Sequence, residues 1–247
     1  MSWKPEHQKP IEILIAIQAR SNSSRFPKKI YEHIGDRRVL DHVISMSNST
    51  AAHIHKYSRV VRMNCRVAVL HPETDNELVR SFRSSNAIFI AGSEEDVLSR
   101  YIAAQRMTDA DYVVRLTSDC PLILDYVIAK HINVAVINQH DYVSNIEESC
   151  RFVADGFDCE VISRKALDWL SRNARDAEDR EHVTTAIRRH RPPTLSQAFI
   201  ASKLDTSRMK MSVDTKEDLD RMREYYHERE HKMTVARRLF GSAVYEL

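Results

Sequence analysis

Glycine and proline are scarce in this chain, which has 4 Gly and 7 Pro among 247 residues. This scarcity excludes collagen-like and low-complexity proteins. The 4 cysteines, Cys65, Cys120, Cys150 and Cys159, form no Cys-x-x-Cys pair, so neither a zinc knuckle nor a redox dithiol is indicated, and we expect reduced thiols. No apolar run approaches the ~20 residues of a membrane span, and the polar N-terminus has no apolar signal core. We therefore expect a cytoplasmic protein with no membrane partner.

An excess of charge of one sign is also missing, because 37 Lys and Arg face 35 Asp and Glu, for a formal net charge of +2. A chain whose net charge is close to zero has no overall positive electrostatic field, so it is not expected to bind nucleic acid. Any basic site must then be local. The residues that are present are typical of a globular protein, with 43% hydrophobic and 29% charged side chains and a length that supports a large core.

Strand and helix patterns alternate along the first part of the chain. Residues 11–19 form an almost unbroken apolar run, typical of a strand buried on both faces of a parallel sheet. A basic loop and a helix pattern from residue 39 follow. The alternation then continues with strands expected at 66–70, 87–91 and 111–117, and helices expected at 73–85, 94–107 and from Asp125. This order predicts an α/β fold with a mostly parallel sheet.

The pattern changes near residue 141. A short strand is expected at 141–145, an extended or hairpin segment around Gly156, and two charged helices within 163–190. Because no Pro- or Gly-rich linker separates this region, we predict one domain, 1–247, with an inserted subdomain at about 141–205. That subdomain would bind an acceptor, act as a lid or form a dimer contact.

One more strand is expected at 209–214, followed by a charged helix over 216–231. Asp214 or Thr215 could cap this helix. In open parallel sheets ligands bind outside the carboxyl ends of the strands, so the loops that follow these ends should face one crevice.

The loop after the first strand, RSNSSRFPKK, holds four cations: Arg20, Arg25, Lys28 and Lys29. Arginine can bind phosphate with two nitrogens, lysine supplies a compact charge, and small polar residues add donors, so the loop is suited to a polyphosphate. A solvated basic loop is the alternative. The spacings of the P-loop and of the Rossmann dinucleotide motif are both absent.

Aspartates stand where two of the expected strands end. Asp119 follows the strand at 111–117, and Asp214 ends the last expected strand. If these strands are neighbours, the two carboxylates could share one Mg²⁺ that is bound mainly through substrate phosphates. Each could instead be a helix cap.

The first loop, the segments around Asp119 and Asp214 and several others together resemble a family. This family is the cytidylyltransferases that activate acidic sugars as CMP derivatives, and the resemblance is greatest to its spore coat polysaccharide (SpsF-like) branch. The resemblance covers nearly the whole chain and rests on segments 15–30, 92–101, 112–123, 141–145, 155–163, 180–184 and 212–219. It implies a three-layer α/β/α, Rossmann-like fold of the nucleotidyltransferase type. It also implies CTP as donor, an acidic sugar or related acceptor, pyrophosphate as leaving group, Mg²⁺ as cofactor, and a homodimer as a plausible assembly.

The resemblance assigns roles to particular residues. The catalytic residues would be Arg20, Lys29 and Asp119. The nucleotide would be bound by Ala19, Arg20, Ser23, Arg25, Lys29, Gly92, Asp96 and Arg100. The acceptor would be bound by Arg115, Asp155, Asp158, Glu181 and His182, and Mg²⁺ by Asp119 and Asp214. Asp155 with Gly156 is equally typical of a hairpin turn, and Glu181 and His182 could simply face solvent on a helix.

Three positions depart from the family pattern. Asn22 and Lys28 stand in the first loop where the family usually has glycine, and Ser118 stands before the predicted metal aspartate. Asparagine tolerates a left-handed backbone, whereas lysine does so poorly. Either the loop has a changed shape, or nucleotide choice and activity have changed.

Other functions remain open at this stage. A nucleotidyltransferase with another nucleotide or a phosphonate acceptor is one, and a catalytically silent nucleotide-binding relative is another. Residues 227–231 also match H-E-x-x-H, the helix motif of zinc proteases. We favour a solvated helix face for that motif, because its surroundings are charged and no third histidine follows.

Overall fold

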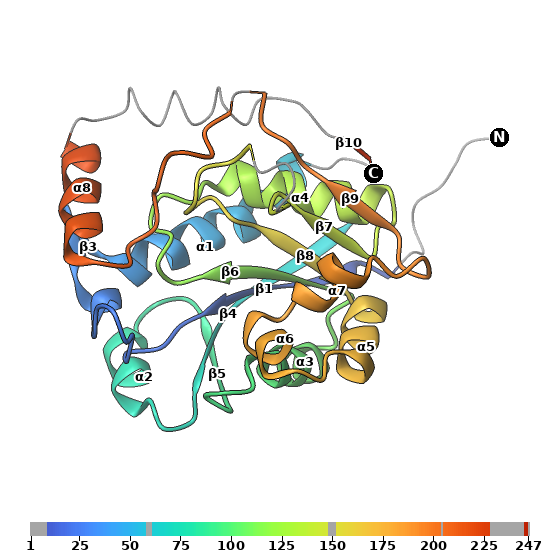
Figure 1. The fold of residues 1–247 in the computed structure, drawn as a ribbon, viewed down its shortest axis with the longest axis horizontal. Coiled ribbons are helices and arrows are strands. Elements are labelled where there is room, and N and C mark those ends of the chain that lie inside the picture. The colour runs from blue at the N-terminus through green and yellow to red at the C-terminus, as the bar shows by residue number, and fades with distance from the viewer. Residues whose placement is uncertain (1–8, 58–60, 148–151, 204, 228–244, 247) are drawn as a thin grey trace.

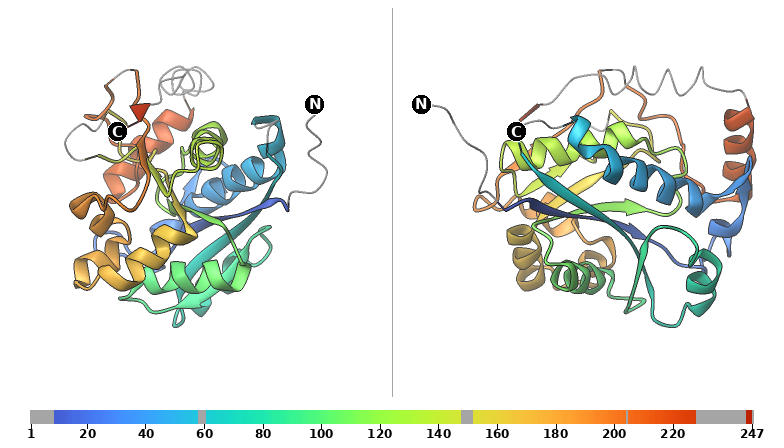
Figure 2. Two further views of the ribbon diagram at one scale, coloured as in Figure 1. Left: turned by 90° about the vertical axis from the view of Figure 1, so that its right-hand side faces the viewer. Right: turned by 180° about the vertical axis from the view of Figure 1, so that it is seen from behind.

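The computed structural model describes residues 9–57, 61–147, 152–203, 205–227 and 245–246. These residues form three layers, with a central sheet covered by helices on both faces (Figures 1 and 2). Within them, eight strands form one sheet in the order β10-β9-β7-β8-β6-β1-β4-β5. The strands are β1 (Ile11–Gln18), β4 (Met63–Pro72), β5 (Ile88–Gly92), β6 (Tyr112–Thr117), β7 (Tyr142–Ser144), β8 (Glu160–Ser163), β9 (Gln197–Phe199) and β10 (Tyr245–Glu246).

The sheet is mostly parallel, as the alternating pattern predicted. Strand β1 pairs in parallel with β4 and β6, β4 pairs in parallel with β5, and β7 with β9. The contacts of β8 with β6 and β7, and of β10 with β9, are antiparallel. A separate small sheet pairs β2 (His33–Ile34) with β3 (Arg37–Arg38), after the short 3-10 helix η1 (Lys29–Tyr31).

Strand β1 lies inside the sheet and contributes to the core on both faces, because successive side chains of a strand point in opposite directions. Ile13, Ile15 and Ile17 pack into one buried cluster, and Leu14 and Ala16 into the other. One face is covered by α1 (Val39–Tyr57) and α4 (Asp125–Ile137). The other is covered by α3 (Val97–Thr108), α5 (Arg164–Asn173), α6 (Ala177–His182) and α7 (Thr185–His190) (Figure 2).

The segment 141–205 contributes strands β7, β8 and β9 to the main sheet and helices α5, α6 and α7 to one outer layer (Figure 1). The sequence predicted two helices in 163–190, and the structure has three. The break lies at Val183, where φ is 64° and ψ is −60°, and the Thr184 N–H donates to the His182 carbonyl at 2.7 Å. This tight turn ends α6 and starts α7 in a new direction.

The expected strand at 209–214 is not a strand in the structure. Only an isolated bridge joins Lys210 to Asp155. The Met211 N–H donates to the Asp155 carbonyl at 2.6 Å, and the Val213 N–H to the Asp119 carbonyl at 2.8 Å. Because these two bonds go to different loops, no continuous ladder forms along one neighbouring strand.

Two helices lie near the carboxyl ends of the parallel strands, α2 (Asn76–Phe82) and α8 (Lys216–His227) (Figure 1). Thr215, one of the two predicted caps, accepts a hydrogen bond from the Asp218 N–H at 3.2 Å. The Asp218 carboxylate accepts in return from the N–H groups of Asp214 and Thr215, both at 3.0 Å. This capping box leaves the Asp214 side chain available for other contacts.

Some sequence predictions fall outside the part of the chain that the structure describes. Of the H-E-x-x-H motif, only His227 is described. Among the described cysteines, Cys65, Cys120 and Cys159 are free thiols, as expected, and Cys150 lies outside the described residues. In the described ranges, none of the helices has the length and apolar character needed to cross a membrane.

Candidate active site

The loop after β1 is closed by its own backbone and anchored to the start of α2. The Lys28 N–H donates to the Ser21 carbonyl at 2.8 Å, which closes the loop. The N–H and hydroxyl of Ser21 both donate to the Asp75 carboxylate, at 2.7 and 2.8 Å. The same carboxylate caps α2 by accepting from the Leu78 N–H at 3.2 Å. These bonds fix the backbone of the loop, and Arg20, Arg25 and Lys28 extend from it into solvent.

Lys28 stands where the family usually has glycine, and its backbone has the conformation that glycine favours. Its φ of 61° and ψ of 15° lie in the left-handed region, which glycine enters freely and other residues enter at a cost. Asn22, the other position where glycine is usual, is not among the described residues with positive φ. The loop thus has a glycine-like conformation at residue 28 although the residue is lysine.

Lys29 brings the two predicted metal ligands together. Its ammonium donates to Asp119 Oδ2 at 2.8 Å, to Asp214 Oδ1 at 3.1 Å and to the Val213 carbonyl at 2.7 Å. The Lys29 side chain is only 9% exposed. The hydrogen bond from Val213 to the loop at Asp119 holds the two carboxylates at this common point, without the neighbouring strands that the sequence suggested.

Asp214 is surrounded by cations. Besides Lys29, its Oδ1 accepts from Arg25 at 2.9 Å, and its Oδ2 lies 3.1 Å from the ammonium of Lys210. Burial opposes ionisation of this carboxyl, but the charges of Lys29 and Lys210 outweigh it and hold the pKa of Asp214 below its usual value. Asp214 is therefore an ionised carboxylate at neutral pH.

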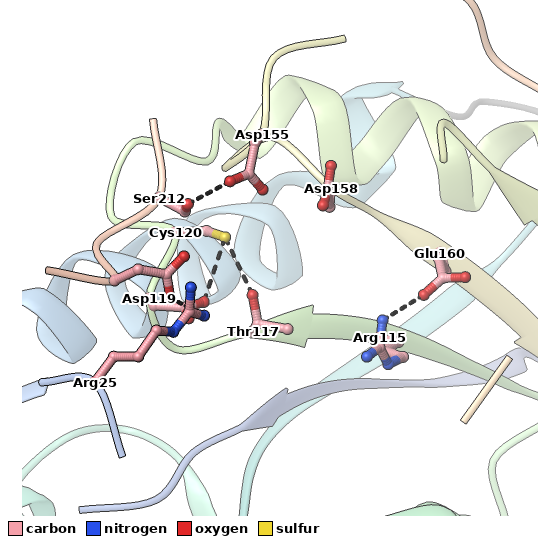
Figure 3. A pocket seen from close by; sticks show the side chains of 10 residues that line it. Arg25, Arg115, Thr117, Asp119, Cys120, Asp155, Asp158, Glu160 and Ser212 are labelled. Atoms are coloured by element: carbon pink, nitrogen blue, oxygen red, sulfur yellow. Dashed lines mark hydrogen bonds and ion pairs between the residues drawn. The ribbon is translucent and has the colours of Figure 1, made fainter. Parts of the chain in front are cut away.

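A pocket of about 240 Å³ opens beside this cluster (Figure 3). Its lining is Arg25, Arg115, Thr117, Asp119, Cys120, Asp155, Asp158, Glu160, Ser212 and Asp214. Of the acceptor residues predicted from the sequence, Arg115, Asp155 and Asp158 line this pocket. Burial and the charges of Asp119 and Asp158 raise the pKa of Cys120, so its thiol is neutral and unsuited to act as a nucleophile.

The Asp155 to Gly156 turn packs against the segment that carries Asp214. The Ser212 hydroxyl donates to Asp155 Oδ2 at 2.6 Å (Figure 3). Gly156 has φ of 105°, and a Cβ there would lie 2.3 Å from the Met211 carbonyl carbon. Only glycine fits at this close approach between the two backbones. The turn at Asp155 and Gly156 is therefore packed directly against the segment at Met211 and Ser212.

Glu160, a residue that the sequence did not single out, forms the fully buried floor of this pocket. Its carboxylate accepts from Arg115 at 2.5 Å (Figure 3), Thr184 at 2.6 Å and Arg188 at 3.0 Å, and from the Tyr142 hydroxyl. Burial raises the pKa of Glu160, but the two arginines outweigh burial and keep the pKa below its usual value. The sequence signals were the segments 155–163 and 180–184 of the family resemblance, which contain Glu160 and Thr184.

The structure does not bring every predicted site residue to the pocket. Glu181 and His182 lie at the end of α6 with exposed side chains and do not line this pocket. Asp96 caps α3 by accepting from the Ser99 N–H at 3.0 Å. Its two carboxylate oxygens also accept hydrogen bonds from Nε and Nη2 of Arg180. Asp96 thus joins α6 to α3.

A second group of predicted nucleotide residues lies at the carboxyl ends of β4 and β5. Arg100 is 2% exposed, donates to the Leu70 carbonyl at 3.3 Å, and has no partner for Nε among the described residues. Burial lowers the pKa of Arg100, and the charge of Arg20 lowers it further. Gly92 makes room for this side chain, because a Cβ there would lie 2.6 Å from Arg100 Cγ.

Arg20 is exposed and lines a second pocket of about 340 Å³. The lining is Arg20, Ser21, Asn22, Pro72, Thr74, Asp75, Asn76, Glu77, Arg80 and Glu94. Ala19 is buried at the end of β1, and Ser23 is half-buried in the loop and lines neither pocket. The first loop therefore contributes one arginine to each pocket, Arg25 to the first and Arg20 to the second.

Solved structures with a similar fold include nucleotidyltransferases. A cytidylyltransferase from Leptospira borgpetersenii superposes with a TM-score of 0.78 at 22% identity, over 96% of this chain and 100% of that one. A CMP:2-keto-3-deoxy-manno-octonic acid synthetase complexed with CTP gives 0.63 at 15% identity, over 88% and 99%. A Mycobacterium tuberculosis protein solved with manganese gives 0.53 at 13% identity, over 87% and 99%. The fold is therefore that of a Rossmann-like nucleotidyltransferase.

The particular family follows from the sequence match. The family profile described as cytidylyltransferase matches residues 14–246, and this chain belongs to that family and is a nucleotidyltransferase enzyme. The spore coat polysaccharide biosynthesis protein SpsF of Bacillus subtilis is 28% identical over 222 residues, which are 87% of this chain and 86% of that protein. The resemblance found in the sequence is confirmed.

Proposed function

We propose that this protein transfers CMP from CTP to a hydroxyl group of an acidic sugar, with release of pyrophosphate, to make a precursor of surface polysaccharide. The observation that carries this proposal is the convergence of Lys29 on Asp119 and Asp214, two carboxylates that line the 240 Å³ pocket. Membership of the family supports the nucleotide, and the sugar-related neighbours support the acceptor class.

The nucleotide phosphates would be bound by Arg20, Arg25 and Lys29 of the first loop and by Arg100. Arg20 faces the second pocket, Arg25 the first, and Lys29 lies between the strand ends. Arg100 adds a buried guanidinium whose Nε has no protein partner within the described ranges. An unpaired buried donor is costly, and a phosphate oxygen would satisfy it.

Divalent metal fits the donor set of this site. Asp119 and Asp214 offer carboxylate oxygens that converge on one ammonium, and hard cations such as Mg²⁺ are typically held by one or two carboxylates and by substrate phosphates. Among the described residues no group of three or more His, Cys, Asp or Glu is placed to hold a metal ion. When bound, the metal would neutralise phosphate charge and orient the triphosphate.

The acceptor would occupy the 240 Å³ pocket. Asp155 and Asp158 supply carboxylates that can accept from sugar hydroxyls, and Arg115 and Arg25 supply guanidinium groups for an anionic substituent. Catalysis would come from holding the acceptor hydroxyl in line with the α-phosphate while Lys29 and the arginines neutralise the developing charge. Homodimer formation, a cytoplasmic location and a substrate-binding, lid or dimer role for 141–205 remain predictions that accompany this proposal.

The test is pyrophosphate release from CTP, UTP, ATP and GTP, each with a panel of sugar acids, sugar phosphates and a phosphonate. We expect release only with CTP and only with a sugar acid, and the Asp119→Asn variant is the inactive control. Release with another nucleotide or with the phosphonate would replace the proposed substrates. Nucleotide binding without release under any combination would indicate a catalytically silent relative.

A further inference from the structure

The ammonium of Lys29 has no free hydrogen-bond donor. It carries three N–H groups, and it meets three acceptors: Asp119 Oδ2, Asp214 Oδ1 and the Val213 carbonyl. The side chain is 9% exposed, so water reaches little of it. In this arrangement Lys29 cannot also hold a phosphate, and its contacts must change when a triphosphate binds.

The carboxylate oxygens that would hold a divalent cation are the same atoms that Lys29 uses. Both oxygens of Asp214 have cationic partners, because Oδ1 faces Lys29 and Arg25 while Oδ2 faces Lys210. Asp119 Oδ2 accepts from Lys29, and its Oδ1 lies 3.6 Å from the Cys120 thiol, a weak donor. A cation that enters between these carboxylates must therefore displace the Lys29 ammonium.

We propose that Lys29 competes with the divalent metal for Asp119 and Asp214, and that it thereby makes strong metal binding depend on the nucleotide. The nucleotide half of this statement rests on the proposed function. A triphosphate offers the ammonium new oxygen acceptors, so Lys29 exchanges two carboxylates for phosphate as the divalent cation takes its former place. The flexible four-carbon stem of lysine permits such a movement from a fixed backbone.

Charge balance explains why the two events are coupled. The two carboxylates carry two negative charges, and Lys29, Arg25 and Lys210 together bring three positive charges to them, so a further cation that approaches meets net repulsion. Once the ammonium lies against phosphate, Asp119 has lost its pair with Lys29 and Asp214 has lost one of its three cations, so the repulsion of a divalent ion falls. Lys29 is therefore a positioning residue that makes the nucleotide bind before the divalent metal. This role is separate from any contact that Lys29 makes with the reacting phosphate.

Lys28 provides a matched control from the adjacent position. It is also a lysine, but its ammonium pairs with Glu77 at 3.0 Å on the surface and lines neither pocket. Removing either lysine changes the net charge of the protein by the same amount. Of these two lysines, only Lys29 contacts Asp119 and Asp214. A change in metal affinity that appears in the Lys29 variant but not in the Lys28 variant is therefore due to these contacts and not to the change in net charge.

The experiment is a titration of nucleotide-free protein with Mn²⁺ alone, followed by electron paramagnetic resonance of the free ion. We expect Lys29→Met to bind Mn²⁺ at least tenfold more tightly than the unaltered protein, a difference of about 1.4 kcal/mol. Lys28→Met should match the unaltered protein. Lys29→Gln, which keeps polar contacts to Val213, should show the same gain and replaces Lys29→Met if that variant does not fold.

Adding Asp119→Asn to Lys29→Met locates the site, because the gain should disappear if the metal binds at this carboxylate. Equal or weaker Mn²⁺ binding in the folded Lys29 variants would overturn the proposal, as would a gain that survives Asp119→Asn. Because no nucleotide or acceptor is present, failure of CMP transfer leaves this readout unchanged. A protein that transfers CMP but shows no gain would refute the competition alone.

Discussion

The left-handed backbone of Lys28 gives a quantitative prediction about the first loop. Two variants, Lys28→Gly and Lys28→Ala, both remove the ion pair to Glu77, so the difference between them reports the backbone alone. At an ordinary position with negative φ, alanine is more stable than glycine by roughly 0.5–1 kcal/mol. At φ of 61° we expect the opposite order.

The magnitude follows from two opposing effects. A side chain with a Cβ in the left-handed region costs roughly 1–2 kcal/mol, and the greater freedom of glycine in the unfolded chain returns roughly 0.5–1 kcal/mol of that. Lys28→Gly should therefore be about 0.5–1 kcal/mol more stable than Lys28→Ala. The ion pair to Glu77 is exposed on both sides and is removed equally in both variants, so it cancels from the difference between them.

Urea unfolding followed by circular dichroism measures this difference, with the denaturant slope checked for constancy among the variants. CTP binding by both variants should stay close to that of the unaltered protein, because the Lys28 side chain points to Glu77 and lines neither pocket. A Lys28→Ala variant that equals or exceeds Lys28→Gly in stability would show that residue 28 is not left-handed. The argument for a glycine-like loop shape would then fail.

Three further outcomes are expected. Asp119→Asn keeps the shape of the side chain but removes its charge, so turnover should collapse at limiting Mg²⁺ while the unfolding curve is retained; full activity would exclude this carboxylate as a metal ligand. Thr184→Val removes a hydrogen bond to the buried Glu160 carboxylate and should lower the free energy of unfolding by about 1.5–3 kcal/mol, with Thr184→Ser restoring most of it. Burial lowers the pKa of His131 from 6.5 to about 4, so the unfolded state binds the proton first and stability should fall as the pH drops from about 6.5 to 4. The loss is about 3 kcal/mol at most, and His131→Leu should show a shallower acid slope; an unchanged slope would exclude His131 as its source.

The sequence by itself determined the layers of the fold and the end of the sheet where the site lies. The apolar run that became β1, and the alternation of strand and helix patterns after it, are local signals that do not depend on distant contacts. Because parallel strands place their carboxyl ends at one edge, the first loop and Asp119 could be assigned to the same crevice. The sequence also supplied the family, through several segments in a fixed order.

The tertiary structure alone decided which side chains meet. Lys29 contacts Asp119 and Asp214 across separations of 90 and 185 residues, and Val213 reaches the loop at Asp119 without forming the expected strand. Glu160 begins a short buried strand, and the partners that surround its carboxylate come from three other elements. A buried carboxylate is tolerated only when such partners surround it, and their arrangement is a property of packing between distant segments rather than of any local pattern.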